Sequence, residues 1–494
     1  MLFYMYRVGF DNDKYLQMQS EKILERASQF EGKLYLEFGG KFFDDLHASR
    51  VLPGFEPNSK IQLLKTIADQ TEIVLVIKAT DIEQNRVRSD QGITYGDDLI
   101  RLINKLKNNG LYVSSVVITK YSGQDSANMF KRRIEQFGVV VYIHYLIDDY
   151  PTNISLVMSD DGFGRNDYIQ TSRPIIVVGA SGSSSGKMAT CLSQLYHESM
   201  RGIKAGYAKF EKFPIWNIPL NHPINLAYEA ATTDISDINM IDPFHLESYG
   251  ISAINYNRDV EVFSILSEVF KKIWGDSPYK SPTDMGVNMF GDCIIDDEVC
   301  QYASKQEIIR RYYRALCKNW MYGGMKAEIQ KVELLMKTAK ISEKDREVVR
   351  HARDKADESN TPCVAIELPD GRMITGKTTP LLGASSAALL NALKVLAGIN
   401  DEVRLISPNM IEPIQNLNLN YLNKDNPQLY AVEVLNALSI STITNPVAEL
   451  VLEQLPKLKN SEAHSTVILS QVDISIFQRL GVNITCEPGH KKSH

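Results

Sequence analysis

The hydrophobic positions in the first half of the chain follow two alternating patterns. Short runs of β-branched and other apolar residues, typical of buried strands, occur at residues 33–39, 72–79, 111–119, 138–145 and 174–179. Between them, apolar residues recur every three or four positions among charged ones, which predicts helices at 13–30, 61–68, 95–107 and 126–137. Strands that alternate with helices of this length predict right-handed strand–helix–strand units and a mostly parallel sheet.

The second half of the chain begins with helical patterns and ends with a mixed one. Helices are predicted at 260–274, 305–320 and 327–338, before a charged stretch at 342–359. An Asp370-Gly371 turn between two apolar runs predicts a β-hairpin, and a helix follows from Gly383. The remaining pattern predicts strands at 403–406, 465–469 and 482–486, a polar loop at 407–423, and helices at 432–438, 447–455 and 474–480.

A chain of 494 residues is too long for a single core, so these elements are expected to form several domains. We predict an α/β domain at residues 1–250 with a mostly parallel sheet, a mainly helical insertion at 251–358, and a C-terminal α/β domain at 359–494. The sequence therefore predicts a multi-domain protein of the α/β class.

Composition narrows the classes of function. The net charge of −6 argues against a broad nucleic-acid-binding surface. No apolar run reaches transmembrane length and the apolar start is too short for a signal peptide, so we expect a cytoplasmic protein without membrane contact. Six scattered cysteines without a C-x-x-C pair are expected to be reduced thiols. Nine histidines without metal-site spacing predict no metal centre of their own.

The fifth predicted strand runs directly into a glycine- and serine-rich turn with one lysine, and a helical pattern begins at once. Backbone N–H groups of such a turn converge on anions, and the helix N-terminus and the lysine add positive charge. We expect a phosphate or another anion to bind at Gly182, Ser183, Ser184, Ser185, Gly186, Lys187 and Thr190.

This turn departs from the usual phosphate-loop spacing at two positions. Ser181 stands where the first glycine should be, and Met188 follows the lysine where Ser or Thr normally binds magnesium. Ser183, Ser185 or Thr190 could supply the missing hydroxyl. ATP with magnesium is one candidate cofactor. The alternatives are a simple anion site and a turn that only joins a strand to a helix.

Charged residues elsewhere could complete the site. Lys209, in a short predicted strand, would return to the same end of the sheet as Lys187. Asp234 and Asp242 are candidate carboxylates for magnesium. His47, in a polar segment after the first strand, is a candidate acid or base.

Two further segments are candidates for ligand contact. The helix that starts at 383–386 has two hydroxyls and free N–H groups, so it is a second possible anion site. The loop at 277–293 combines Pro, Gly, Asp and Asn with apolar residues, and we expect it to face a ligand or an interface. A second substrate near 284–292 would then lie between the first and last domains.

Two partial resemblances bear on topology. The hairpin and the helix after it resemble the opening of a cytidine-deaminase-like fold, over about a third of the last domain. The zinc signature of that fold is absent, so deaminase activity is disfavoured. Residues 206–217 resemble the phosphate-loop class that includes dethiobiotin and CTP synthetases, in which a second lysine returns beside the phosphates.

Six stretches spread through nearly the whole chain resemble one bacterial family, catalogued as domain of unknown function 1846. They lie at residues 33–41, 47–57, 161–166, 186–198, 282–289 and 382–394. The resemblance implies a three-part architecture and a cytosolic bacterial protein, and it implies no activity.

The sequence supports one leading hypothesis and two alternatives. The leading one is a cytosolic enzyme, of transferase or ligase type, that binds a nucleotide or a phosphorylated metabolite at 182–190. The first alternative is a non-catalytic sensor or binding protein for an anionic metabolite. The second is an enzyme without metal or nucleotide that uses Asp44, His47 and Arg50. The expected partner is a small anionic ligand, and a homo-oligomer is compatible with the sequence.

Overall fold

The computed structural model describes residues 7–88, 92–182, 184–233, 237–424 and 426–489, and these form two compact units. The larger unit contains Val8–Glu229 and the segment that ends at Cys300. The smaller unit contains the chain from Gln301 onward. The helices expected between residues 251 and 358 are divided between the two units.

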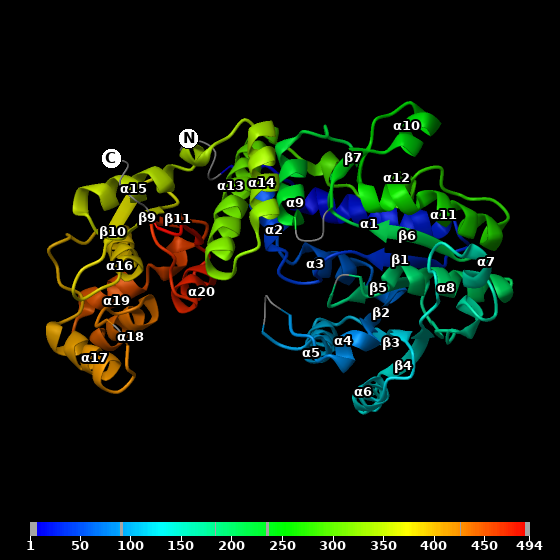
Figure 1. Cartoon of the computed structure of the whole chain (residues 1–494), viewed down its shortest axis with the longest axis horizontal. Helices are drawn as coiled ribbons and strands as arrows, with labels where there is room; N and C mark the ends of the chain where they lie inside the picture. The colour runs from blue at the N-terminus through cyan, green and yellow to red at the C-terminus, as the bar shows by residue number, and fades with distance from the viewer. Residues whose placement is uncertain (1–6, 89–91, 183, 234–236, 425, 490–494) are drawn as a thin grey trace. The chain divides into compact units, whose positions relative to one another are not determined.

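A six-stranded sheet forms the centre of the larger unit, with its strands in the order β4-β3-β2-β5-β1-β6 (Figure 1). All neighbouring strands are parallel, which confirms the predicted α/β class and the parallel sheet. The strands are β1 (Leu34–Phe38), β2 (Thr71–Lys78), β3 (Val113–Tyr121), β4 (Val140–Tyr145), β5 (Ile175–Ala180) and β6 (Gly206–Phe210).

The position of β5 matters most for function. It lies between β1 and β2, although β3 and β4 come between β2 and β5 in the sequence, and the chain then crosses to β6 on the far side of β1. Ile175–Ala180 is buried along its whole length, as expected for a central parallel strand. This is the topological switch point of the sheet, where open α/β folds bind ligands beyond the carboxyl ends of their strands.

Helices pack on the sheet and bury these strands. Among them, α8 contacts β1, β5 and β6, while α4, α5 and α6 contact the strands of the β2–β4 side. The first eight helices are α1 (Asn12–Ser28), α2 (Leu46–Val51), α3 (Ser59–Thr66), α4 (Ala79–Glu83), α5 (Tyr95–Asn108), α6 (Asp125–Glu135), α7 (Ile154–Val157) and α8 (Lys187–Met200).

The rest of the larger unit covers the edge strand β6. The loop at 277–293, expected to face a ligand or an interface, packs along β6 within the same unit. Val287 donates its N–H to the carbonyl of Lys209 at 2.9 Å, and Gln19 of α1 donates to the carbonyl of Val287 at 2.9 Å. The elements here are α9 (Pro223–Ala231), β7 (Asn239–Ile241), α10 (Pro243–Tyr249), β8 (Ile254–Tyr256), α11 (Asn257–Trp274) and α12 (Pro282–Met285).

The smaller unit has a four-stranded mixed sheet in the order β10-β9-β11-β12. The predicted hairpin is confirmed, because β9 and β10 pair antiparallel around Gly371, whose φ is +79°. The strands are β9 (Cys363–Glu367), β10 (Met373–Lys377), β11 (Glu462–Ser465) and β12 (Asn483–Cys486).

Helices make up the rest of the smaller unit. They are α13 (Asp297–Tyr322), α14 (Lys326–Thr338), α15 (Glu347–Ser359), α16 (Ala384–Ala397), α17 (Pro408–Asn420), α18 (Ala431–Ser441), α19 (Pro446–Leu452) and α20 (Gln471–Arg479), with the first turn of α13 falling in the larger unit. Three predictions are wrong. Residues 403–406 form no strand, and the expected loop at 407–423 is largely the helix α17. The strand expected at 465–469 lies earlier, as β11.

The guanidinium of Arg346 ties the helices of the smaller unit to its sheet. Arg346 is almost fully buried just before α15, and it donates to Glu462 at 2.5 Å and to the carbonyls of Ala463 and Asn483 at 3.0 and 2.9 Å. These acceptors lie on β11 and at the start of β12. The start of α15 is therefore fixed against the sheet by a buried charge-assisted network.

The structure also shows the state of the cysteines and the character of the helices. The six cysteines are all free thiols, five of them buried. Within the described part of the chain, no helix has both the length and the apolar character needed to cross a membrane.

Candidate functional site

The turn between β5 and α8 follows the fifth strand, as predicted, and the strand order places it at the switch point of the sheet. Gly186 is the N-cap of α8 and has a φ of +92°, and Ser184 also has a positive φ of +51°. Thr119, near the end of β3, donates its hydroxyl to the carbonyl of Ser185 at 2.6 Å. The turn is thus held from the neighbouring strands in a conformation that favours glycine at position 186.

Close contacts explain the glycine at position 182 as well. A Cβ atom on Gly182 would lie 2.6 Å from Cε1 of Tyr95, the first residue of α5. Backbone and aromatic ring can approach this closely only because the side chain is absent. Neither Tyr95 nor Thr119 can be identified from the sequence as a neighbour of the turn, because their contact with it depends on the strand order.

Three hydroxyl groups in the turn and at the start of α8 have no hydrogen-bond partner within the described part of the chain. They belong to Ser181, Ser185 and Thr190. Ser185 is 3% exposed and Thr190 is fully buried, so bulk water does not reach these oxygens freely. A buried donor without a partner costs about 1–3 kcal/mol, and such groups need an explanation such as a bound ligand or an ordered water.

Lys187 is the first residue of α8, and it makes no hydrogen bond or ion pair with any described residue. The positive end of the helix dipole repels a cation at the helix N-terminus. A bound anion there is attracted both by the dipole and by the charge of Lys187. The uncompensated lysine and the unpaired hydroxyls therefore lie in one short segment.

A second lysine, Lys60, lies at the same end of the sheet and was not identified from the sequence. It is the second residue of α3 and is 2% exposed. Its ammonium donates to the carbonyl of Gly39 and lies 4.9 and 5.5 Å from the ring centroids of Phe38 and Phe210. One signal could have marked it: a lysine in the first turn of a helix is unfavourable for the helix dipole.

Burial lowers the pKa of Lys60 well below its usual value. The positive charges of Lys212 and Lys187 lower this pKa further, while Asp45 and Glu211 act in the opposite direction. Lys60 and Lys187 are therefore close enough to repel each other.

His47, the predicted acid or base, lies on α2 beside the Asp45–Lys212 ion pair. Its ring meets that of Phe213 edge-on, with 5.2 Å between the centroids. Burial alone would raise the pKa of Asp45, but Lys212, Lys60 and His47 hold it well below its usual value. Asp45 therefore interacts electrostatically with both His47 and Lys60.

Lys209 lies in the carboxyl half of β6, at the predicted end of the sheet, but its charge is compensated within the fold. The ammonium donates to Asp259 and Tyr256 and lies 3.4 Å from Glu211. Burial would lower the pKa of Lys209, but Asp259 and Glu211 raise it above its usual value. Lys209 is therefore protonated and already paired.

Asp242 is fully buried and forms the N-cap of α10. One carboxylate oxygen accepts the N–H groups of Phe244 and His245 at 3.0 and 3.1 Å. The other accepts the N–H and the hydroxyl of Thr283 at 3.1 and 2.7 Å. In Figure 1, α10 lies well apart from β5 and the start of α8, so the structure does not bring Asp242 to the turn.

Two predicted site residues, Ser183 and Asp234, lie outside the described residues. Among the residues that are described, no group of three or more His, Cys, Asp and Glu side chains is placed to hold a metal ion.

The second candidate anion site, at 383–386, is filled from within the protein. Ser385 donates to the carboxylate of Asp473 at 2.7 Å, and Ser386 donates to the carbonyl of Leu429 at 2.8 Å. Asp473 also accepts the N–H of Ala431 at 2.9 Å. The carboxylate of Asp473 therefore takes the position of an anion between the starts of α16 and α18.

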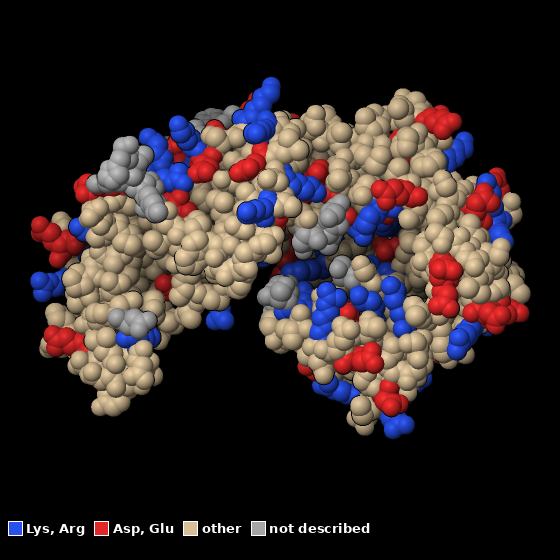
Figure 2. All heavy atoms as spheres, in the orientation of Figure 1, with Lys and Arg blue, Asp and Glu red and all other residues tan. Residues whose placement is uncertain are grey.

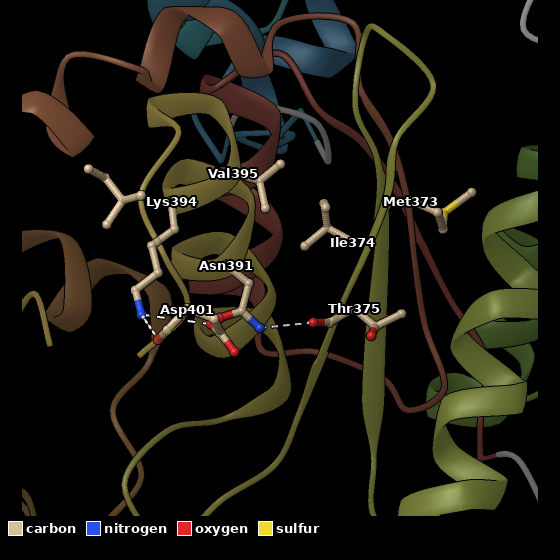
Figure 3. A pocket seen from close by; sticks show the side chains of 8 residues that line it. Met373, Ile374, Thr375, Asn391, Lys394, Val395 and Asp401 are labelled. Atoms are coloured by element: carbon tan, nitrogen blue, oxygen red, sulfur yellow. Dashed lines mark hydrogen bonds and ion pairs between the residues drawn. The ribbon is translucent and has the colours of Figure 1, made fainter. Parts of the chain in front are cut away.

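The smaller unit also has a surface pocket of about 220 Å³ between β10 and the end of α16 (Figure 3). Lys394 donates to the carbonyl of Asp401 at 2.6 Å, and Asn391 donates to the carbonyl of Thr375 at 2.9 Å. These side chains already hydrogen-bond to backbone carbonyls, so the pocket has fewer unpaired polar groups for a charged ligand than the β5–α8 turn.

Lysine and arginine side chains gather around a hollow in the larger unit, on the side toward which its parallel strands run (Figure 2). Such a concentration of one sign of charge in a concave surface attracts anions.

Comparison with known proteins identifies the family. The model of the N-terminal domain of DUF1846, a domain of unknown function, matches residues 8–340, and the model of its C-terminal domain matches 344–494. A UPF0371 protein of Streptococcus uberis is 52% identical over 484 residues, with 98% of each chain covered. A UPF0371 protein of Streptococcus thermophilus is 51% identical over the same length and coverage. The predicted resemblance is confirmed, and the chain belongs to this bacterial family of unknown function, DUF1846 or UPF0371.

Proposed function

We propose that this protein binds a nucleotide or a phosphorylated metabolite at the β5–α8 turn, and that it acts in the cytoplasm as an enzyme of transferase or ligase type. One observation carries the proposal. The buried hydroxyls of Ser181, Ser185 and Thr190 have no partner in the described part of the chain, and they lie in the β5–α8 turn and the start of α8, as Lys187 does.

A phosphoryl group would satisfy all of these groups at once. Its oxygens accept hydrogen bonds from hydroxyls and backbone N–H groups, and its charge offsets that of Lys187 and suits the dipole of α8. Either Ser185 or Thr190 could supply the hydroxyl that Met188 lacks, so these are the residues that would contact magnesium if the ligand is a nucleoside triphosphate.

The lysine side chains at the site support the proposed class of reaction, transfer or ligation. Phosphoryl transfer and ligation depend mainly on positioning and on neutralising charge. Lys187 provides positive charge, and an anion bound beside Lys60 would favour the protonated form of that lysine. Lys209 lies at the same end of the sheet and is paired with Asp259.

Titration calorimetry with ATP and magnesium, ADP and orthophosphate tests the proposal. We expect at least one of these to bind the wild type, and Lys187→Met to weaken that binding by at least about tenfold, equivalent to roughly 1.4 kcal/mol. Lys204→Met is the matched control, because Lys204 is an exposed lysine shortly after the end of α8. No binding by the wild type, or an equal effect of both substitutions, would refute the assignment.

A second candidate function is a non-catalytic sensor or binding protein for an anionic metabolite. It is favoured by the engagement of Asp242 in the cap of α10, which removes one predicted magnesium carboxylate from the site. Incubation of the protein with ATP, magnesium and candidate acceptors distinguishes the two. Tight binding without release of ADP or phosphate over hours would favour the sensor.

A further inference from the structure

We propose that Lys60 and the Gly39-Gly40 turn form a second anion subsite beside Lys187, so that the ligand carries two linked anionic groups. This inference rests on the proposed function and specifies the ligand class: a diphosphate or triphosphate chain, or a phosphate linked to a carboxylate. One group would contact Lys187 and the β5–α8 turn, and the other would contact Lys60.

The first argument is the contrast between Lys60 and the other buried lysines of this region. Lys209 is paired with Asp259, and Lys212 is paired with Asp45. Lys60 is at least as deeply buried, yet within the described part of the chain its only hydrogen-bond acceptor is the carbonyl of Gly39 and no carboxylate is within ion-pair distance.

Burying an ammonium group without a counter-charge costs several kcal/mol, and a lysine avoids that cost either by pairing its charge or through a lowered pKa, as Lys60 does. The two aromatic rings beside Lys60 offset only part of it, since a cation–π contact contributes about 0.5–2 kcal/mol. The proximity of Lys187, which has no ion-pair partner among the described residues, adds repulsion. A ligand with two negative charges would offset both the burial cost of the Lys60 ammonium and its repulsion by Lys187.

The second argument is access. Gly40 has a φ of +65°, and a Cβ atom there would lie 3.3 Å from the ammonium nitrogen of Lys60. Any larger residue would crowd the ammonium on this side, so glycine at position 40 keeps the space beside it free of side-chain atoms.

The third argument is the placement of the two turns. Strands β1 and β5 are hydrogen-bonded neighbours in parallel register, with Glu37 opposite Val178. The turns that follow them, Gly39-Gly40 and the β5–α8 turn, therefore leave the sheet side by side at the same edge. The electrostatic effect of Lys187 on Lys60 agrees with this placement.

Titration calorimetry with orthophosphate and pyrophosphate tests the subsite. A ligand that joins two anionic groups gains from both lysines, so we expect the wild type to bind pyrophosphate at least about tenfold more tightly than orthophosphate. Lys60→Met should remove this advantage and leave orthophosphate affinity within about twofold, whereas Lys187→Met should weaken both.

Gly40→Ala is a second variant. It keeps Lys60 and places a methyl group beside its ammonium. We expect it to weaken the binding of pyrophosphate more than that of orthophosphate. Phosphonoacetate, in which a carboxylate replaces one phosphoryl group, identifies the second anionic group. If Lys60→Met weakens phosphonoacetate as much as pyrophosphate, the subsite accepts a carboxylate; if it weakens pyrophosphate alone, the subsite requires a phosphoryl group.

The outcomes separate this inference from the proposed function. If the wild type binds the probes and Lys60→Met changes neither affinity, or weakens both equally, the second subsite is refuted and the β5–α8 site stands. If the wild type binds neither the probes nor any nucleotide, the proposed function and the subsite are refuted together.

Discussion

Single hydrogen bonds determine the shape of the β5–α8 turn. The hydroxyl of Thr119, a buried residue of β3, donates to the carbonyl of Ser185. The same hydroxyl lies 3.3 Å from the carbonyl of Ile77 on β2. Thr119 thus connects two strands to the turn without belonging to the turn itself.

Replacement of Thr119 by Val should therefore destabilise the larger unit and weaken anion binding. The substitution nearly preserves the shape and leaves the carbonyl of Ser185 without its donor, which costs about 1–3 kcal/mol. Urea unfolding measures the loss, and calorimetry with pyrophosphate measures the binding. Thr119→Ser keeps the hydroxyl and should retain most of the affinity; an equal loss in both variants would contradict this role.

The site could be predicted from the sequence only in part, and Lys60 shows why. The glycines, the serines and Lys187 of the β5–α8 turn are contiguous, so their pattern indicated an anion site directly. Lys60 comes more than a hundred residues earlier, and it reaches that turn because β5 inserts beside β1. No local pattern encodes this strand order.

At the scale of elements, capping explains the position of Asp242. Both of its oxygens accept hydrogen bonds, from the first turn of α10 and from Thr283 at the start of α12. The carboxylate thus joins two short helices that could not bury much apolar surface on their own.

Asp242→Ala should lower the free energy of unfolding of the larger unit and leave magnesium–nucleotide binding unchanged. Loss of an N-cap costs about 0.5–2 kcal/mol, and the lost bonds to Thr283 add to it. Urea unfolding and calorimetry with ATP and magnesium report the two effects. Unchanged stability with a loss of magnesium-dependent affinity would instead assign Asp242 to the site.

The elements that were predicted correctly share a strong local signal. Strand β5 begins with four β-branched residues, and its burial along the whole length matches that run. In the segment 407–423, asparagines and prolines interrupt the apolar positions, so its sequence predicts a loop. Pro408 is tolerated at the first turn of α17, and Pro413 is accommodated inside it. Tertiary packing against the C-terminal core outweighs the weak local preference there.

At the scale of the whole molecule, the smaller unit depends on buried charges for its integrity. Arg346 has five acceptors on α13, β11 and β12, and it is 1% exposed. Removing one partner of such a network leaves the others buried without compensation.

Arg346→Met should lower the stability of the smaller unit by about 3–5 kcal/mol, because Glu462 then lacks its closest positive charge. Differential scanning calorimetry should show a lower melting temperature for this unit, with that of the larger unit unchanged. Arg350→Met is the matched control, since Arg350 pairs with Glu347 on the exposed face of α15 and such a pair contributes at most about 1 kcal/mol.

Acid should destabilise the smaller unit through Glu487. Burial would raise the pKa of this carboxyl, but His464 and Arg353 lower it from 4.5 to about 2. Because the folded pKa is lower than the unfolded one, its contribution is complete above about pH 4.5 and is lost as the pH falls toward 2.

Glu487→Gln should therefore reduce stability at pH 7 by roughly 1.5–3 kcal/mol, the range for hydrogen bonds to charged groups. It should also make the decline in melting temperature between pH 5 and 3 shallower than in the wild type. Glu358→Gln, on the exposed end of α15, should change neither quantity. An unaltered acid profile for Glu487→Gln would exclude this carboxylate as the cause.

The insertion of β5 between β1 and β2 also constrains how the chain folds. While residues up to about 170 are being synthesised, β1 and β2 have no partner on the sides that β5 will occupy, and each presents an unpaired strand edge. The central hydrogen bonds form only after a closure over more than a hundred residues, which makes folding slow. The same strand that carries the candidate ligand site is thus the last piece needed to complete the five strands from β4 to β1, and a ribosome-bound intermediate of this protein is exposed to misassociation until β5 emerges.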